Sequence, residues 1–378
     1  MSIQVSYKKQ IIFFLILMII TLFLAEGIIR TSGIVDMQLN CKFTEHELFK
    51  DYSYFEKQSL CNEYSSIGYD RNDVIQIPLP KEGKHLNINS DGFRGKEMDL
   101  QNKDYTIFFL GGSTAFGVVS SGDEFTIPAI LEKKLASEGF EVSVINAGVP
   151  NSNSRDERYY IEKYISKYSP NMIIMYDGWN DMVPLKDNFT YEQFKNQSYY
   201  VNQMVPDENI TKTGILTLFA KIDYKTGIGI AKYFSNILYS KNIERIDEFS
   251  EKHLVTVETR LQDNWSNVCE FGNKNNIIIV NILQPILGSS NRTLSEFEKF
   301  SSIEFYNPYL WKFHLDNRQY HPCNQVHDLR NVFEGMDEIP IYFDNGHTSD
   351  FGNEIIANQI SEKIIPIILQ DIKSKTNQ

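Results

Sequence analysis

The sequence of 378 residues lacks the features that mark several classes of protein. Its four cysteines are too few for a disulfide-rich scaffold of this length. It has no excess of basic residues, since 37 Lys and Arg stand against 49 Asp and Glu, and the net charge is −12. A nucleic-acid binder needs a basic face, so that class is disfavoured. It shows no internal repeat or low-complexity tract, and 42% hydrophobic with 23% charged residues is typical of a globular protein.

One long apolar run stands near the N-terminus. Residues 11–25 form an apolar run with Thr21 as its one hydroxyl residue, two lysines precede it, and the run resumes at 28–29. An uncleaved membrane anchor needs about 17–25 apolar residues, whereas a secretory signal has a basic start and about 7–15. The sequence fits both, and Ala25-Glu26-Gly27 would serve as a cleavage site. Either reading places the bulk of the chain outside the cytoplasm, because the lysines stay inside. A buried core helix is the third reading.

This pattern gives a provisional division of the chain. We expect a cytoplasmic N-terminus at 1–10, a transmembrane anchor or signal at 11–30, a stalk and N-terminal extension at 31–100, and the main domain at 101–378. Within the main domain, residues at about 183–242 interrupt the pattern and are expected to form a lid-like insertion. The cysteines allow one or two disulfides in an oxidising compartment, or separate thiols, at Cys41, Cys61, Cys269 and Cys323.

Short continuous apolar runs alternate with helical spacing in the main domain. Strands are predicted at 106–110, 142–145, 172–176 and 277–283, with a short fifth expected at 341–343. Helices are predicted at 124–138, 156–168, 245–271 and 351–372, the last with a kink at Pro366. Continuous apolar strands that alternate with helices indicate a parallel sheet covered on both faces. The predicted fold class is therefore α/β, a flavodoxin-like doubly wound parallel sheet of about five strands.

A candidate site residue follows each of three successive predicted strands. Ligands of such sheets bind beyond the carboxyl ends of the strands. Ser113 follows the first strand in the motif GGST, Gly148 follows the second in NAGV, and Asn180 follows the third in GWND. Taken singly, these are a capping serine, a turn glycine and a helix cap. Taken together, they are a candidate nucleophile, a backbone N–H that a ligand can approach closely, and an amide donor for an oxyanion.

Seven histidines compete to be the general base. His347 is favoured because Asp344 precedes it by three residues in DNGH, and a nearby carboxylate can hold the imidazole tautomer. His327 with Asp328 is the reserve candidate. The surrounding segment also carries residue types that bind zinc, at His314, Asp316, His321 and Cys323. Their spacing matches no metal motif, so we expect a polar loop near the site.

These four blocks, in this order, resemble the SGNH hydrolases, also called the GDSL esterase/lipase family. The third block matches the family's Gly-x-Asn-Asp and the last its Asp-x-x-His, whereas Gly112 stands where the family often has Asp. The resemblance covers about residues 104–372 apart from the insertion. It implies that Ser113 attacks an ester carbonyl, that His347 accepts its proton and that Asp344 orients His347. The oxyanion would meet the N–H groups of Ser113 and Gly148 and the Asn180 side chain.

The resemblance also implies a substrate class and leaves alternatives open. Membrane-tethered members outside the cytoplasm often act on O-acyl groups of surface polysaccharides, and the family needs no metal or organic cofactor. We expect an esterase on a small acyl ester or acylated carbohydrate, attached to the membrane by its N-terminal helix and not binding nucleic acid. An O-acyltransferase would use the same triad, and residues 216–238 could be the interfacial lid of a lipase. The remaining rivals are a non-catalytic binding module on this fold and a flavodoxin-like nucleotide binder, although no Gly-Lys-Ser/Thr phosphate loop is present.

Overall fold

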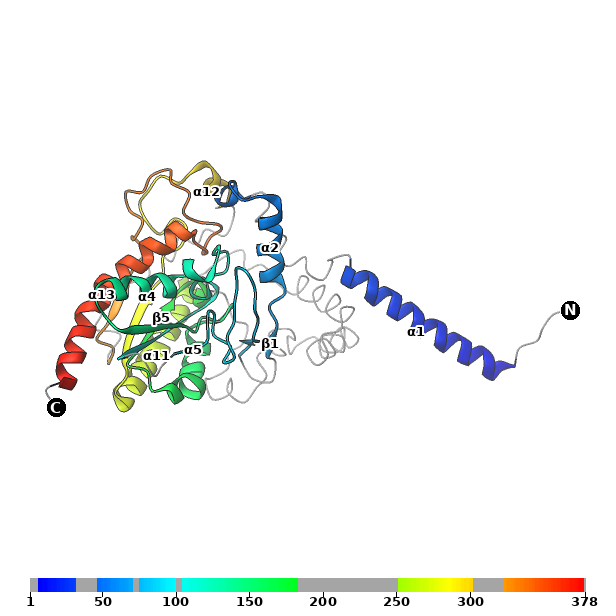
Figure 1. Cartoon of the computed structure of the whole chain (residues 1–378), viewed down its shortest axis with the longest axis horizontal. Coiled ribbons are helices and arrows are strands. Elements are labelled where there is room, and N and C mark those ends of the chain that lie inside the picture. Colours follow the sequence, from blue (N-terminus) through cyan, green and yellow to red (C-terminus); the bar gives the residue numbers. More distant parts are fainter. Residues whose placement is uncertain are drawn as a thin grey trace. The chain divides into compact units, whose positions relative to one another are not determined.

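The computed structural model describes residues 6–31, 46–70, 75–99, 104–182, 251–301 and 322–376 (Figure 1). The chain divides into two compact units, one of Met1–Cys41 with Lys186–Arg245 and one of Lys42–Leu185 with Ile246–Gln378. The insertion predicted at about 183–242 lies outside the described residues.

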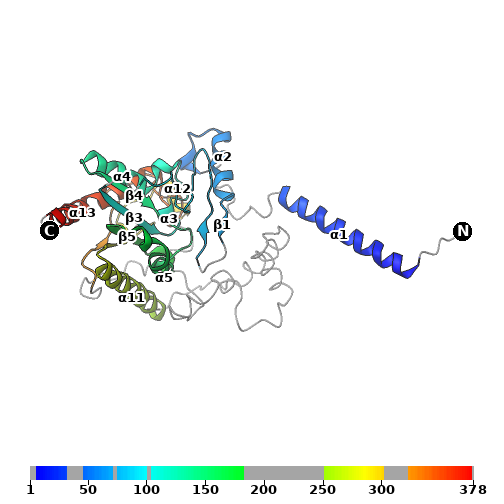
Figure 2. The same ribbon diagram turned by 60° about the horizontal axis from the view of Figure 1, so that its bottom comes forward.

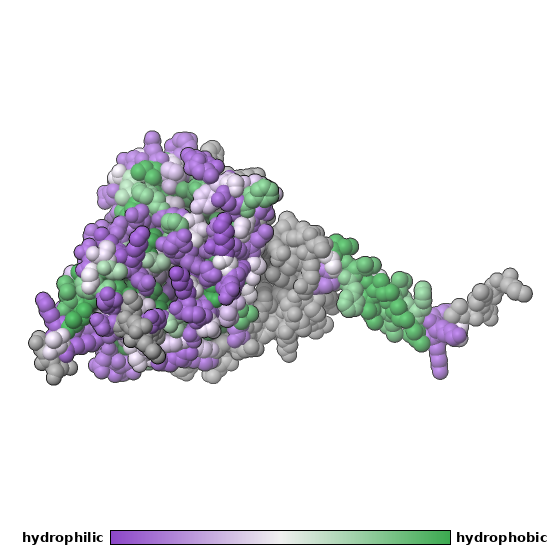
Figure 3. All heavy atoms as spheres, viewed as in Figure 1, coloured by the Kyte–Doolittle hydropathy of each residue, from purple (hydrophilic) through white to green (hydrophobic). Residues whose placement is uncertain are grey.

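Helix α1 (Tyr7–Thr31) is the described part of the first unit. Its stretch Tyr7–Ile28 is long and apolar enough to cross a membrane, and its large apolar side chains are exposed. Figure 3 shows them as a continuous apolar surface along the helix. This helix suits the membrane anchor or the signal sequence that the apolar run predicts.

The second unit is built on a parallel sheet. In its described residues five strands pair in the order β4-β3-β5-β6-β7, and every neighbouring pair is parallel. The strands are β3 (Tyr105–Gly111), β4 (Val142–Asn146), β5 (Met172–Asp177), β6 (Ile278–Leu283) and β7 (Val326–Asp328). Counted along the sheet this is the 2-1-3-4-5 order of flavodoxin-like folds, and the predicted fold class is confirmed.

Helices cover both faces of this sheet. Figures 1 and 2 show α4 (Ile127–Ser137) and α13 (Asp350–Thr376) on one face and α5 (Ser154–Tyr160) and α11 (Glu251–Asn275) on the other. Every residue of β3, β4 and β5 is buried, as expected for strands with helices on both sides. A π-helical turn (Ile161–Ile165) and a 3₁₀ turn (Ser166–Tyr168) extend α5, so the four predicted helices correspond to helical segments.

The fifth strand differs from the prediction. Residues 341–343 do not join the sheet, whose fifth strand is β7 instead. The N–H groups of Ile341 and Tyr342 both donate to Glu298 Oε1 at 3.0 Å, and Tyr342 makes only an isolated bridge to Thr348. A buried carboxylate thus takes the hydrogen bonds that a neighbouring strand would otherwise accept.

The N-terminal extension carries structure that the sequence did not reveal. It forms a short 3₁₀ turn (Glu47–Phe49), helix α2 (Tyr54–Ser65) and the two-stranded pair β1 (Tyr69–Asp70) and β2 (Ile77–Pro78). A capping box formed by Ser53 and Glu56 starts α2. The extension is tied to the sheet, because the Arg94 N–H donates to the Asn146 carbonyl at 3.1 Å.

Disulfide bonds are among the alternatives left open by the sequence, and one joins Cys269 to Cys323. It links α11 to the segment before β7. The Asn281 amide, on the strand between them, donates to both sulfur atoms at 3.3 Å. Cys61 is also disulfide-bonded.

Candidate active site

Ser113 stands at the carboxyl end of β3, where the chain enters the short helix α3 (Ser113–Phe116). Gly112 precedes this helix, and a Cβ atom built on it would lie 2.1 Å from Asn180 Nδ2. A side chain at position 112 would therefore displace the Asn180 amide. This close approach explains the glycine, and it brings the Asn180 amide next to the residue that precedes Ser113.

Ser113, His347 and Asp344 form an unbroken line of hydrogen bonds. His347 Nδ1 lies 2.8 Å from Asp344 Oδ2, and His347 Nε2 lies 2.8 Å from Ser113 Oγ. A carboxylate can only accept, so the hydrogen of the neutral imidazole lies on Nδ1 and Nε2 accepts from the hydroxyl. The fold thus brings together the three residues that the sequence nominates, in the tautomer that a general base requires.

The turn that carries Asp344 and His347 is closed by its own hydrogen bonds. Asp344 Oδ1 accepts the N–H groups of Gly346 at 2.9 Å and His347 at 2.8 Å. The Phe343 N–H donates to the His347 carbonyl at 2.8 Å. Asp344 therefore fixes the backbone of His347 as well as its ring.

The electrostatics of this pair keep the acid charged and make the imidazole a stronger proton acceptor. Burial alone would lower the pKa of His347, but the charge and hydrogen bond of Asp344 raise it above its ordinary value. Burial would raise the pKa of Asp344, but the charge of His347 and the hydrogen bonds that the carboxylate accepts bring it well below its ordinary value. Asp344 thus stays ionised throughout the pH range in which His347 takes up and releases a proton.

Asn180 lies in α6 (Trp179–Met182), directly after β5, which is the neighbour of β3 in the sheet. Its Nδ2 donates to the Ser152 carbonyl at 2.6 Å. An amide nitrogen carries two hydrogens, so this bond orients the group and leaves a second N–H for a ligand. Sequence reasoning identified Asn180 but not Ser152, because a backbone acceptor leaves no mark on residue type.

Gly148 has a packing role in the structure. A Cβ atom built on it would lie 2.3 Å from the Phe116 backbone nitrogen, so only glycine lets this loop approach α3 so closely. The Gly148 N–H donates to Asn146 Oδ1 at 3.1 Å. This predicted oxyanion donor therefore has a partner within its own turn.

A buried group of acids supports the turn next to Asn180. Asp181 accepts from the Ser154 hydroxyl at 2.5 Å and from the Ser154 N–H at 3.3 Å, and Ser154 lies two residues beyond Ser152. Asp177 accepts from the Trp265 indole N–H at 2.6 Å. Burial, followed by the charge of Asp181, raises the pKa of Asp177 to about 8. In the sequence, Asp181, which follows Asn180 in GWND, is the residue that could have indicated this buried group.

Trp179 is a further neighbour that the sequence did not single out. A Cβ atom built on Gly346 would lie 3.5 Å from the Trp179 ring, so the indole packs against the turn that carries His347. Its place in the GWND motif, one residue before Asn180, could have indicated that it lies next to the site.

The reserve candidates stand apart from this hydrogen-bonded line. His327 and Asp328 lie on β7, burial lowers the pKa of His327, and Asp328 pairs with Arg330 at 2.6 Å. Among the residues that the structure describes, no three His, Cys, Asp or Glu side chains gather to hold a metal ion. The other residues with zinc-binding side chains in this segment, at 314, 316 and 321, lie outside the described ranges.

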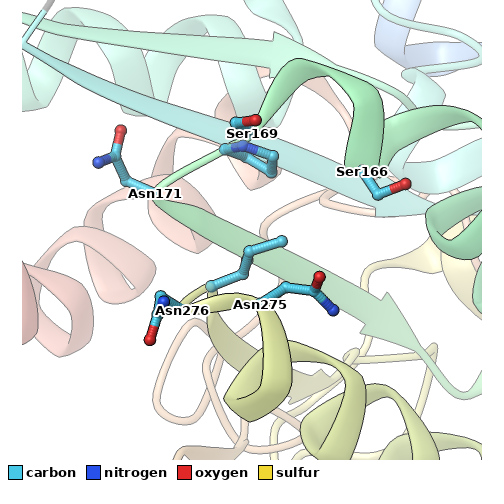
Figure 4. A pocket seen from close by; sticks show the side chains of 7 residues that line it. Ser166, Ser169, Asn171, Asn275 and Asn276 are labelled. Carbon is cyan, nitrogen blue, oxygen red and sulfur yellow. The ribbon is translucent and has the colours of Figure 1, made fainter.

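A small polar cavity of about 170 Å³ lies at the amino ends of the strands, opposite the end of the sheet that carries Ser113 and Asn180. Asn171 and Ile277, which precede β5 and β6, help to line it. Figure 4 shows serines and asparagines around it, at Ser166, Ser169, Asn275 and Asn276. Since Ser113 and Asn180 follow the carboxyl ends of their strands, this cavity belongs to the other end of the sheet.

No family model and no curated protein matches the chain. Solved structures similar to it include a two-domain esterase (CEX) active on acetylated mannans, with 14% identity over 69% of this chain and a TM-score of 0.37. The chain spans 48% of that esterase's length. It is also similar to the psychrotrophic esterase EstA from Pseudoalteromonas sp., with 13% identity over 70% of this chain and 99% of that one and a TM-score of 0.38. A third is a putative lipolytic protein of the G-D-S-L family from Desulfitobacterium hafniense DCB-2, with 12% identity over 68% and 99% and a TM-score of 0.36.

Proposed function

We propose that this chain is a serine esterase of the SGNH type, which hydrolyses carboxylic O-acyl esters. The observation that carries the proposal is the line of hydrogen bonds from Ser113 through His347 to Asp344, at the carboxyl edge of the sheet. A nucleophile, a base in reach and an acid that orients the base define this chemistry by geometry. The four sequence blocks and their resemblance to the family point to the same activity.

The reaction follows from these positions. Ser113 Oγ attacks the ester carbonyl carbon while His347 Nε2 takes the hydroxyl proton, and the carbonyl oxygen becomes an oxyanion. The oxyanion collapses, the carbon–oxygen bond to the alcohol breaks, and His347 gives its proton to the leaving alkoxide. Water then attacks acyl-Ser113 with His347 as the base, the bond between the acyl carbon and Ser113 Oγ breaks, and His347 returns the proton to Ser113 as the acid leaves. The charge of Asp344 stabilises the imidazolium that forms in each half-reaction.

The proposed oxyanion hole draws on three donors. The Ser113 N–H is at the start of α3, where helical N–H groups have no partner within the helix. The second N–H of Asn180 Nδ2 is held in place by the bond of the first to Ser152. The Gly148 N–H joins them only by giving up its bond to Asn146.

We further propose that helix α1 attaches the chain to the membrane, with residues 31–100 as stalk and extension and 101–378 as the catalytic domain outside the cytoplasm. The apolar length of α1 and the Cys269–Cys323 disulfide support this placement, since disulfides persist in oxidising compartments. The proposed substrate is an O-acyl group on surface carbohydrate, as the family resemblance implies for tethered members.

Turnover of nitrophenyl esters by the full-length chain in detergent tests the activity. We expect hydrolysis of acetyl or other short-chain esters by the wild type, and loss of at least about 10³-fold in kcat in Ser113→Ala. Acetylated glycans then test the substrate class. Addition of sugar acceptors separates hydrolysis from acyl transfer, because a transferase moves the acyl group to the sugar. A folded wild type without turnover on nitrophenyl esters or glycans would favour the binding-module reading.

A further inference from the structure

A buried histidine from the N-terminal extension contacts the turn that carries the triad acid. His46 is 6% exposed, and its Nε2 lies 2.7 Å from the Phe343 carbonyl oxygen. Its Nδ1 accepts the Leu48 N–H at 3.2 Å. Since Nδ1 accepts, the hydrogen of the neutral ring lies on Nε2, and His46 donates to Phe343.

Aromatic packing holds the His46 ring in this position. The ring stacks on Phe343, with centroids 4.1 Å apart and planes 14° apart. It also contacts Phe297, with centroids 3.9 Å apart. Three parts of the chain therefore meet at the buried His46 side chain. They are the N-terminal extension, the segment around Phe297 and the turn that carries Asp344 and His347.

The Phe343 carbonyl belongs to the peptide unit that also contains the Asp344 nitrogen. Inside the turn, the Phe343 N–H donates to the His347 carbonyl at 2.8 Å, while the Phe343 carbonyl accepts from His46. Rotation of the peptide plane between residues 343 and 344 would swing the Asp344 carboxylate away from His347 Nδ1. Catalytic groups must be held within about 0.5 Å and 10–20° of their working geometry.

We propose that His46 is a positioning residue for the Asp344–His347 pair. The N-terminal extension that carries His46 is then part of the support of the active site. The inference rests on the proposed function, because it assigns His46 a role in the same triad.

Two substitutions separate the hydrogen bond from the ring. His46→Phe keeps an aromatic ring against Phe343 and removes the donor, whereas His46→Gln keeps an N–H of similar reach and removes the ring. In the full-length chain we expect His46→Phe to lower kcat about tenfold with little change in KM, since small misplacements of catalytic groups slow the chemical step. His46→Gln should recover part of that loss.

The proton NMR signal of His347 Nδ1–H gives a readout that packing alone would not move. A hydrogen bond to a carboxylate shifts this signal far downfield, and we expect His46→Phe to move it upfield. Phe49→Leu is the matched control, because Phe49 lies in the same aromatic cluster, 6.1 Å from Phe343 between ring centroids. It should lower the melting temperature and leave both kcat and the signal unchanged.

The outcomes distinguish the inference from the proposed function. A folded His46→Phe variant with wild-type kcat and an unchanged signal would overturn the positioning role, as would an equal loss of kcat in Phe49→Leu. If His46→Phe does not fold, wild-type kcat and an unshifted signal in His46→Ala would overturn it as well. A wild type without esterase turnover would contradict the proposed function, while the His347 signal would still test the contact.

Discussion

At the scale of single residues, Asp344 contacts both the ring and the backbone of His347 in the candidate site. Its carboxylate holds the His347 ring through Nδ1 and also accepts the N–H groups of Gly346 and His347. One side chain thus sets the tautomer of the base, its charge preference and the shape of the turn. A substitution there should change both the rate and its dependence on pH.

Asp344→Asn tests this role. The amide removes the negative charge that raises the pKa of His347, and it can hold the ring in the wrong tautomer. We expect kcat to fall by about 10⁴-fold, as for this change in other Ser-His-Asp sites. His347 must be neutral to accept a proton, so the residual activity should rise through a lower pH midpoint than in the wild type. The measurement is kcat/KM against pH for both proteins.

Asp328→Asn is the control for that experiment. Asp328 belongs to the reserve pair and contacts Arg330, so its loss should leave the pH profile of the wild type in place. An Asp344→Asn variant with an unchanged acid midpoint would contradict the electrostatic role of Asp344.

Two of the candidate residues could be found from the sequence because Ser113 and Asn180 lie in short motifs that follow strand ends, whose positions a parallel sheet makes predictable. The pair Asp344–His347 could be found from its Asp-x-x-His spacing, although the strand predicted before it is not part of the sheet. The residues that hold these side chains in place could not be predicted. The contact of His46 with the Phe343 carbonyl spans 297 residues and uses a backbone acceptor, so no local pattern indicates it.

At the scale of elements, continuous apolar runs predicted strands wherever helices cover both faces of the sheet. The predicted bounds of β3, β4, β5 and β6 agree with the structure to within one residue at each end. The prediction of the fifth strand was wrong because the actual strand, β7, has no continuous apolar run. Val326–Asp328 is short and only partly buried, and it carries a histidine and an acid, whereas the more apolar 341–343 is held by Glu298 instead.

Elements in the extension were missed because local capping, rather than apolar periodicity, defines them. Helix α2 begins with the reciprocal hydrogen bonds of Ser53 and Glu56, and only three of its residues are buried. Its apolar pattern is therefore weak, even though its N-terminal signature is present in the sequence.

At the scale of the whole molecule, the apolar helix and the disulfide both support the proposed placement outside the cytoplasm. The bond between Cys269 and Cys323 spans 54 residues, and closing a loop of that length in the unfolded chain is worth about 4 kcal/mol in the entropy model. A bond of this kind forms in an oxidising space. The N-terminal helix is the feature that would deliver the domain there.

Alkylation of cysteines tests this placement. We expect Cys269 and Cys323 to resist alkylation when the full-length chain is exported. A chain without residues 1–31, produced in the reducing cytoplasm, should be alkylated at both positions and lose about 2–4 kcal/mol of unfolding free energy. Mass spectrometry and denaturant unfolding give the two readouts. Full alkylation of the exported chain would argue against the proposed compartment.

Covalent labelling tests whether Ser113 is a nucleophile activated by His347. A fluorophosphonate transfers its phosphonyl group to an activated serine oxygen with loss of fluoride, and peptide mass spectrometry locates the adduct. We predict a single adduct on Ser113 of the full-length chain, much slower labelling in His347→Ala, and none in Ser113→Ala. A folded wild type that stays unlabelled, or that is labelled at another serine, would contradict the account.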